Sequence, residues 1–277
     1  NMKLQLIHTS WYFLLFYFPL LYFGFLDDYL IIKQKNNKGK YISKNCSLQS
    51  ARKKETEISD NKTVTVYSGF TAFGKKLPFS LICTAEIISD NTVEFSLKAE
   101  NETGYDIEAV YFPAPFNSKR KGKNSYHVDP MRQGFILPDG QIKHIIPMIG
   151  YTHMKRRINS GDAYMPVWGR VCDNHSFTAI VETPFDASMY SSFGKHGAFI
   201  NSVYWLSSLG KLSYERKIRF IFHENGDYNT VAKDYRNYLI KNNLLVLYRF
   251  FVVIYIYFFC EKAIFIYFVF FFYFFNL

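Results

Sequence analysis

The chain has 277 residues, which is enough for one or two domains, and 33 Lys and Arg against 23 Asp and Glu residues give it a formal charge of +10. A basic balance of this size is typical of chains that bind nucleic acid or anionic surfaces. The cations, however, fall in short loop-like clusters, no predicted helix carries a continuous basic stripe, and no RNA-binding signature occurs. We therefore expect no specific nucleic-acid recognition.

The cysteines and histidines indicate no metal site. Cys46, Cys83, Cys172 and Cys260 are too few and too scattered for a disulfide framework or a zinc site. One disulfide among the first three and free buried thiols are both open interpretations. The histidines show no spacing typical of zinc ligands. The sequence therefore predicts no metal and no cofactor.

Residues 1–30 form an apolar segment. The block from Trp11 to Leu26 suits a signal-peptide core or a signal anchor, although Pro19 and Gly24 interrupt it and no small-residue cleavage site follows. Apolar translation of upstream sequence is the alternative interpretation. The segment predicts a secreted or membrane-associated protein. Residues 31–60, rich in Lys and Asn, are expected to be a polar linker.

Residues 61–226 carry a β pattern. Runs of β-branched and aromatic residues alternate with turn-forming Asn, Asp, Gly and Pro. These runs cover residues 62–70, 79–88, 91–100, 107–115, 140–150, 176–184 and 212–222. Short strands at regular intervals, without helices between them, predict an antiparallel β-sandwich.

Residues 227–243 are predicted to form one amphipathic helix. Apolar and aromatic residues recur at helical spacing. They are Tyr228, Val231, Ala232, Tyr235, Tyr238 and Leu239. Asp227 or Asn229 can cap its start, and Asn242 with Asn243 can end it.

Residues 244–277 are apolar except for Arg249, Glu261, Lys262 and Asn276. As a single helix this tail would place Glu261 and Lys262 near the centre of a bilayer, at a cost of several kcal/mol. Two short helical spans turning at residues 260–262 are the other membrane arrangement. A membrane tail and non-native read-through are both open interpretations.

The order of these elements resembles the galactose-mutarotase-like β-sandwich (supersandwich) that precedes a (β/α)8 barrel in carbohydrate-active enzymes. The stretches that carry the resemblance are "AVYFPAP" at 109–115, "GFILPDGQ" at 134–141, "YMPVWGR" at 164–170, "FTAIVETPFDA" at 177–187, "KLSYERKIRFIF" at 211–222 and the helix from Tyr228. The group it is most similar to surrounds the endo-α-N-acetylgalactosaminidases of glycoside hydrolase families 101 and 129.

The resemblance implies an accessory domain rather than a whole enzyme. In such enzymes the barrel carries paired carboxylates, and a barrel needs at least about 200 residues. Only residues 244–277 follow the helix, so we expect a non-catalytic domain, inactive as it stands, that contributes carbohydrate contacts at most. The alternative is a membrane-anchored extracellular binding or structural protein with a β-sandwich ectodomain.

Five residues are candidates for carbohydrate contacts, each with a structural alternative. They are Tyr164, Trp168, Arg170, Asp186 and Trp205. Tryptophans can stack on the apolar face of a sugar or fill the core. Arg170 can donate to hydroxyl groups or pair with Asp186 or Glu182 to join the sheets, and Asp186 can bind sugar or cap a turn. No catalytic residue is predicted.

Overall fold

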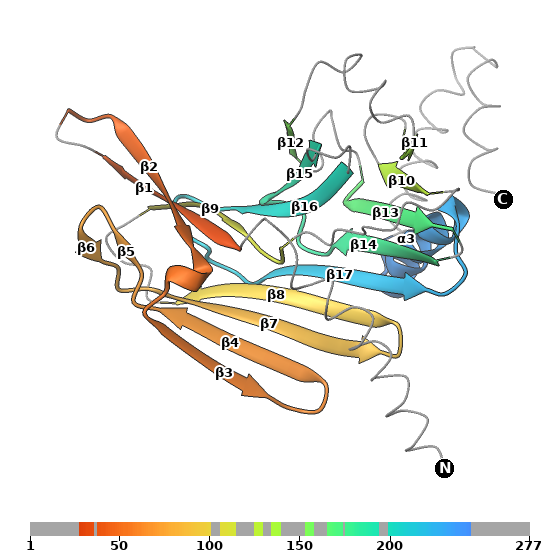
Figure 1. The fold of residues 1–277 in the computed structure, drawn as a ribbon, viewed down its shortest axis with the longest axis horizontal. Coiled ribbons are helices and arrows are strands. Elements are labelled where there is room, and N and C mark those ends of the chain that lie inside the picture. The colour runs from red at the N-terminus through yellow and green to blue at the C-terminus, as the bar shows by residue number, and fades with distance from the viewer. Residues whose placement is uncertain are drawn as a thin grey trace, which may run out of the picture. The chain divides into compact units, whose positions relative to one another are not determined.

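Two antiparallel β-sheets form a sandwich in this protein (Figure 1). The structure, a computed structural model, describes residues 28–35, 38–100, 106–114, 125–129, 134–139, 153–157, 165–173, 175–193 and 199–244. The prediction of a mainly β sandwich followed by one helix is confirmed.

The sheets hold strands that are far apart in the sequence. The six-stranded sheet has the order β12 (His153–Arg157), β15 (Ala187–Phe193), β16 (Phe199–Leu206), β9 (Asp106–Tyr111), β1 (Tyr29–Lys35) and β2 (Tyr41–Ser47). The nine-stranded sheet has the order β11 (Phe135–Pro138), β10 (Tyr126–Asp129), β13 (Val167–Cys172), β14 (His175–Val181), β17 (Arg216–His223), β8 (Thr92–Glu100), β7 (Ser80–Ser89), β4 (Lys62–Ser68) and β3 (Lys53–Ile58). A small hairpin pairs β5 (Thr71–Ala72) with β6 (Lys75–Lys76).

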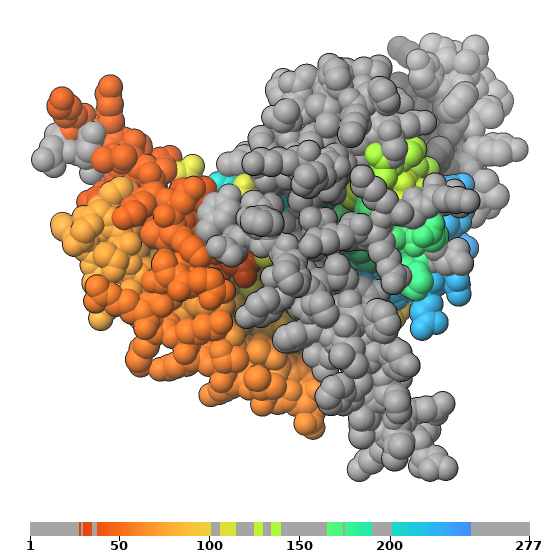
Figure 2. Space-filling model, viewed as in Figure 1, coloured from red at the N-terminus to blue at the C-terminus, as the bar shows by residue number. Residues whose placement is uncertain are grey.

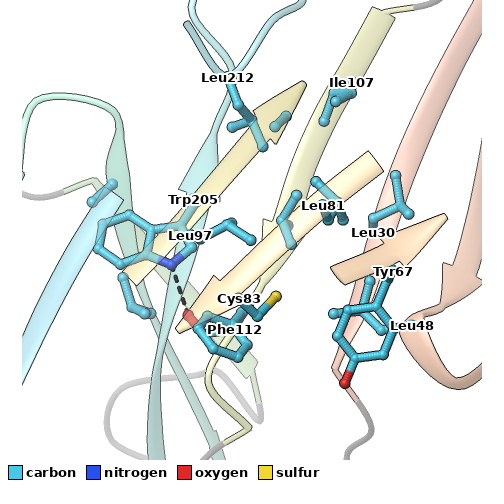
Figure 3. Close-up of a cluster of buried hydrophobic side chains, with 14 of the residues drawn as sticks. Leu30, Leu48, Tyr67, Leu81, Cys83, Leu97, Ile107, Phe112, Trp205 and Leu212 are labelled. Carbon is cyan, nitrogen blue, oxygen red and sulfur yellow. Dashed lines mark hydrogen bonds between the residues drawn. The ribbon is translucent and has the colours of Figure 1, made fainter. Parts of the chain in front are cut away.

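The core lies between the two sheets because alternate residues of each strand point inward. Leu81 and Cys83 on β7 and Ile218 on β17 are buried there. Trp205 on β16 is fully buried, and its Nε1 donates to the carbonyl oxygen of Phe112 at 2.7 Å (Figure 3). Each aliphatic side chain buried in this way stabilises the fold by roughly 1.5–3 kcal/mol.

The segment 31–60, predicted as a polar linker, belongs to the sandwich. It contains most of β1, all of β2 and β3, and the 3-10 helix η1 (Leu48–Ser50). β1 pairs with both β2 and β9, so it lies inside the six-stranded sheet. The prediction was wrong because Lys and Asn residues dominate this stretch, whereas only three of its described side chains, Ile32, Cys46 and Leu48, are buried in the main core.

The three cysteines within the described ranges are free thiols, so the structure favours that interpretation over a disulfide among them. Cys46 and Cys83 are buried in the main core. Burial raises the pKa of both thiols, which keeps them protonated at neutral pH.

The helix α3 (Tyr228–Lys241) follows β17, as the sequence predicts. Asp227 caps it: Oδ1 accepts a hydrogen bond from Thr230 N at 2.9 Å, and Thr230 Oγ1 in turn accepts one from Asp227 N at 3.1 Å. At the other end Asn243 adopts a φ of 57°, and Leu244 N donates to Leu239 O at 2.9 Å. This left-handed ending is a Schellman arrangement.

Of the predicted apolar helical segments 1–30 and 244–277, the structure describes residues 28–30, where the strand β1 begins at Tyr29, and Leu244. The other residues of both segments lie outside the described residues. Within the part of the chain that the structure does describe, no helix is long and apolar enough to cross a membrane.

Candidate functional site

The turn between β14 and β15 carries Asp186, the centre of a hydrogen-bonded group. Its Oδ2 accepts hydrogen bonds from Tyr214 OH at 2.8 Å, from Arg216 Nη2 at 3.3 Å and, at shorter range, from Ser208 Oγ. We call Asp186, Ser208, Tyr214 and Arg216 the Asp186 cluster. It joins the turn to the loop that leads into β17.

Arg216 is the buried member of the Asp186 cluster. Its side chain has no exposed surface, and its guanidinium lies 3.4 Å from the centre of the Tyr214 ring. Nη2 also donates to Leu206 O at 3.2 Å and Nη1 to Tyr214 O at 3.2 Å. Burial, together with the hydrogen bond to Asp186, raises the pKa of Tyr214, so the phenol stays a donor.

Arg170 forms a second buried group, with Asp139 and His127. Its Nη1 and Nη2 donate to the two carboxylate oxygens of Asp139 at 2.9 and 2.7 Å, a bidentate pair. His127 Nε2 lies against Arg170 Nη1, since the two residues are direct neighbours across β10 and β13. Burial and the neighbouring guanidinium hold the pKa of His127 well below its usual value. The imidazole is therefore neutral.

The partner of Arg170 differs from the one the sequence suggested. Asp139, which directly follows β11, takes that place, whereas Asp186 pairs with Arg216 and Glu182 with Arg219. The strand order explains the difference, because β10 and β11 lie beside β13 and bring Asp139 to it. Arg170 therefore pins strands of one sheet and does not link to the Asp186 turn.

Glu182 and Asp186, four residues apart, do not act on a common point. Glu182 Oε1 lies 2.7 Å from Arg219 Nη2, which also bonds Glu94 Oε2 at 3.0 Å. Burial raises the pKa of Glu182 in spite of Arg219, and the carboxylate of Glu94 raises it further. Glu182 and Asp186 thus pair with different arginines.

Both tryptophans that the sequence predicts as sugar contacts lie in the interior. Trp168 on β13 is 2% exposed and packs edge-on against Phe220, with ring centroids 6.4 Å apart. Trp205 lies on β16, where it is paired with Ala187 of β15, next to Asp186. Tyr204 is buried on the opposite face of that sheet against Tyr111. Tyr164 lies outside the described residues. The structure thus brings Asp186 and Trp205 together but leaves both tryptophans without an exposed face.

Phe185 is an exposed aromatic residue that the sequence does not predict as a sugar contact. Its side chain is 79% exposed at the tip of the turn that carries Asp186. Its position between Pro184 and Asp186, in a turn after a buried strand, is the signal that identifies it. The loop of the Asp186 cluster exposes Leu209 as well. This turn and loop place an exposed aromatic ring beside polar groups, a combination that occurs in small-molecule sites.

An open depression of about 380 Å³ lies at the start of α3. Its lining residues are Asp173, Asn225, Gly226, Asp227 and Thr230. The carboxylate of Asp227 is engaged in capping the helix. Among the described residues, no group of three His, Cys, Asp or Glu side chains is placed to hold a metal ion.

Solved structures share this fold. The structure of α-N-acetylgalactosaminidase NagBb from Bifidobacterium bifidum in complex with GalNAc matches with a TM-score of 0.62 at 20% sequence identity, over 79% of this chain and 34% of that one. The ligand-free form gives 0.60 at 19% identity, and the complex with Gal-NHAc-DNJ gives 0.62 at 20% identity, both with the same coverage. No family model and no curated protein matches the sequence. The similarity shows the fold, and the chain spans about a third of the length of the Bifidobacterium protein.

Proposed function

We propose that this chain provides a non-catalytic β-sandwich domain of a glycoside-hydrolase-like protein, of the group around families 101 and 129, with at most a carbohydrate-binding role. The observation that carries the proposal is the match of 79% of the chain to part of an α-N-acetylgalactosaminidase solved with GalNAc. Since the matched part is about a third of that protein, a supporting domain accounts for the similarity.

The ion pairs of Glu182 and Asp186 support a non-catalytic role. A glycosidase needs two carboxyl groups about 5–10 Å apart that face the same glycosidic bond. Asp186 accepts hydrogen bonds from three side chains of its own cluster. Glu182 pairs with Arg219, which it shares with Glu94. Through these hydrogen bonds and ion pairs, the two carboxylates hold the fold together.

The turn 182–186 is the place that we propose for sugar contacts. Phe185 offers an exposed ring, and Asp186 beside it keeps a side chain that is 24% exposed. Of the other predicted residues, Trp205 lies on the adjacent strand and supports the turn from inside. Trp168 is buried in the core and Arg170 pairs with Asp139 within one sheet, so both stabilise the fold. Tyr164 stays a predicted sugar contact.

A titration of the full chain with N-acetylgalactosamine and galactose, up to millimolar concentrations and followed by NMR, tests the binding role. Phe185→Ala removes the exposed ring and is expected to weaken binding by about tenfold, which corresponds to 1.4 kcal/mol. Phe135→Ala is the matched control, because Phe135 is also an exposed aromatic residue but lies on the edge strand β11. Absence of binding at millimolar sugar, or equal loss in both variants, contradicts the proposed site.

Hydrolysis of aryl α-N-acetylgalactosaminides and aryl α-galactosides tests the non-catalytic role. The full chain is expected to release no more phenol than a buffer blank does. Turnover that disappears in Glu182→Gln or Asp186→Asn would show that the chain is an enzyme.

A further inference from the structure

The positive charge of the chain is concentrated in one part of the sandwich. Between Tyr29 and Lys54 the sequence carries eight cations and no Asp or Glu. They are Lys33, Lys35, Lys38, Lys40, Lys44, Arg52, Lys53 and Lys54. Residues 28–79 contain 11 Lys and Arg against 4 Asp and Glu, a balance of +7 out of the +10 of the whole chain.

The fold gathers these cations at one end of the sandwich. The β1–β2 hairpin projects there, beside the β5–β6 hairpin with Lys75 and Lys76 (Figures 1 and 2). Cys46 Sγ donates to Thr71 O, which holds β2 against β5. The backbone of Arg52 passes close to Gly69, just before β5. Segments up to forty residues apart in sequence therefore present their charges together.

Most of these cations face solvent. Residues 38–45, 52–54, 75 and 76 are all exposed. Lys53 pairs with Glu55 on its own strand. Within the described residues, Lys44, Arg52, Lys75 and Lys76 make no ion pair with a carboxylate. We define the cationic end as the exposed residues Lys38, Lys40, Lys44, Arg52, Lys54, Lys75 and Lys76.

We propose that the cationic end binds a sulfated polysaccharide. The inference rests on the proposed carbohydrate-binding function and names the ligand class for a second surface of the same domain. Sulfate esters carry a permanent negative charge, and a polysaccharide can bear several of them along a few sugar units. Lysine ammonium groups on two neighbouring hairpins meet such a chain at several points, and each contact releases counterions.

Two other polyanions fit the surface less well. Single-stranded nucleic acid needs aromatic rings on which bases stack. Tyr41 is the exposed ring of the hairpin, and Lys33 Nζ covers one of its faces at 4.7 Å. A membrane surface needs one apolar face. The exposed side chains of Tyr41 and Ile42 are adjacent on β2, so they point to opposite faces of the ribbon.

Binding of the full chain to chondroitin sulfate, compared with unsulfated chondroitin, tests the proposal. The two polymers share N-acetylgalactosamine and uronate units and differ in the sulfate esters. Chondroitin sulfate is expected to bind at about 50 mM salt and to weaken steeply as salt is raised. The triple variant Lys38→Gln, Lys40→Gln, Lys44→Gln is expected to bind at least about tenfold more weakly, with a salt slope reduced by about two to three.

The matched control is the triple variant Lys211→Gln, Lys233→Gln, Lys241→Gln. These lysines are also exposed, and the net charge changes by the same amount, but none of them is among the residues that define the cationic end. The control is expected to change affinity by less than about twofold, because only local contacts release counterions. Equal losses in both variants would mean that net charge alone drives binding and would overturn the proposal.

Three further results would also overturn it: equal binding of unsulfated chondroitin, tighter binding of single-stranded DNA, and tighter binding of phosphatidylserine vesicles through the same lysines. Circular dichroism of each variant checks that the fold is retained. Chondroitin sulfate binding and the titration with neutral sugars can fail separately, because N-acetylgalactosamine and galactose carry no charge that the lysines could bind. Failure here with retained N-acetylgalactosamine binding rejects the cationic end alone, whereas failure of the Phe185 test leaves this measurement intact.

Discussion

Arg216 and Asp186 meet where β17 begins, with Nη2 of the fully buried guanidinium 3.3 Å from Asp186 Oδ2. Removing one partner of a buried ion pair leaves a charge without compensation, which costs about 3–5 kcal/mol. We expect Asp186→Ala to lower the free energy of unfolding by about 3 kcal/mol, at the low end of that range because Asp186 is partly exposed and Arg216 keeps two carbonyl acceptors.

Urea unfolding of the single and double variants measures this pair. Arg216→Met removes the charge and keeps most of the volume, so the double variant with Asp186→Ala should lose less than the sum of the two single losses. Additive losses would show that the two side chains do not interact.

Gly169 on β13 is expected to tolerate no side chain. A methyl group there would lie 2.5 Å from Val231 Cγ2 and 3.1 Å from Phe177 O. Overpacking of this kind typically costs about 1–3 kcal/mol. Gly169→Ala should therefore lower the free energy of unfolding by about this amount, which is measured as a lower midpoint of urea unfolding. Adding Val231→Ala makes room for the methyl group and should recover part of the loss. No recovery in the double variant would contradict the close packing of Val231 on this strand.

The N-cap of α3 is expected to depend on Asp227. Asp227→Ala removes the acceptor for Thr230 N and should cost about 1 kcal/mol. Asp227→Asn keeps an oxygen at the same place and serves as the control, with a loss of only a few tenths of a kcal/mol. Thermal unfolding of both variants measures the difference. Equal losses would attribute the effect to the negative charge instead of the hydrogen bond.

Stability is expected to fall as the pH is lowered from 7 to 5, through His127. Its folded-state pKa is depressed by burial and by Arg170, so below about pH 6.5 the unfolded chain binds a proton that the folded chain does not. The unfolded state is then favoured, by at most about 1.4 kcal/mol per pH unit.

Urea unfolding at several pH values tests this slope. His127→Gln removes the titrating group, so between pH 7 and 5 its free energy of unfolding should vary less than that of the parent chain. An unchanged slope in this variant would assign the pH dependence to other groups. The comparison concerns the slope alone, because the substitution also changes the contact with Arg170.

The candidate site shows where prediction from sequence stops. The sequence predicts a turn at "TPFDA" and points to Asp186 in it, but it does not single out Phe185, whose exposure is a property of the tertiary structure. Trp168 and Trp205 were predicted as either sugar platforms or core residues, and their burial is settled only by the strands on both sides. Ring exposure depends on neighbours that are distant in sequence.

Local chemistry determined the strand runs at 62–70, 79–88, 91–100, 107–115, 176–184 and 212–222 and the helix that starts after Asp227, since periodicity, turn residues and caps act over a few positions. The predicted run 140–150 lies outside the described residues. The tertiary structure decided that residues 29–58 form strands, that Arg170 pairs with Asp139, and that lysines of two hairpins share one end of the sandwich. These outcomes depend on strand order, and strand order follows from how the whole core is filled. The sequence by itself predicts the strands that carry a clear apolar pattern, whereas the packing of the two sheets decides the remaining strands and selects the neighbours of each.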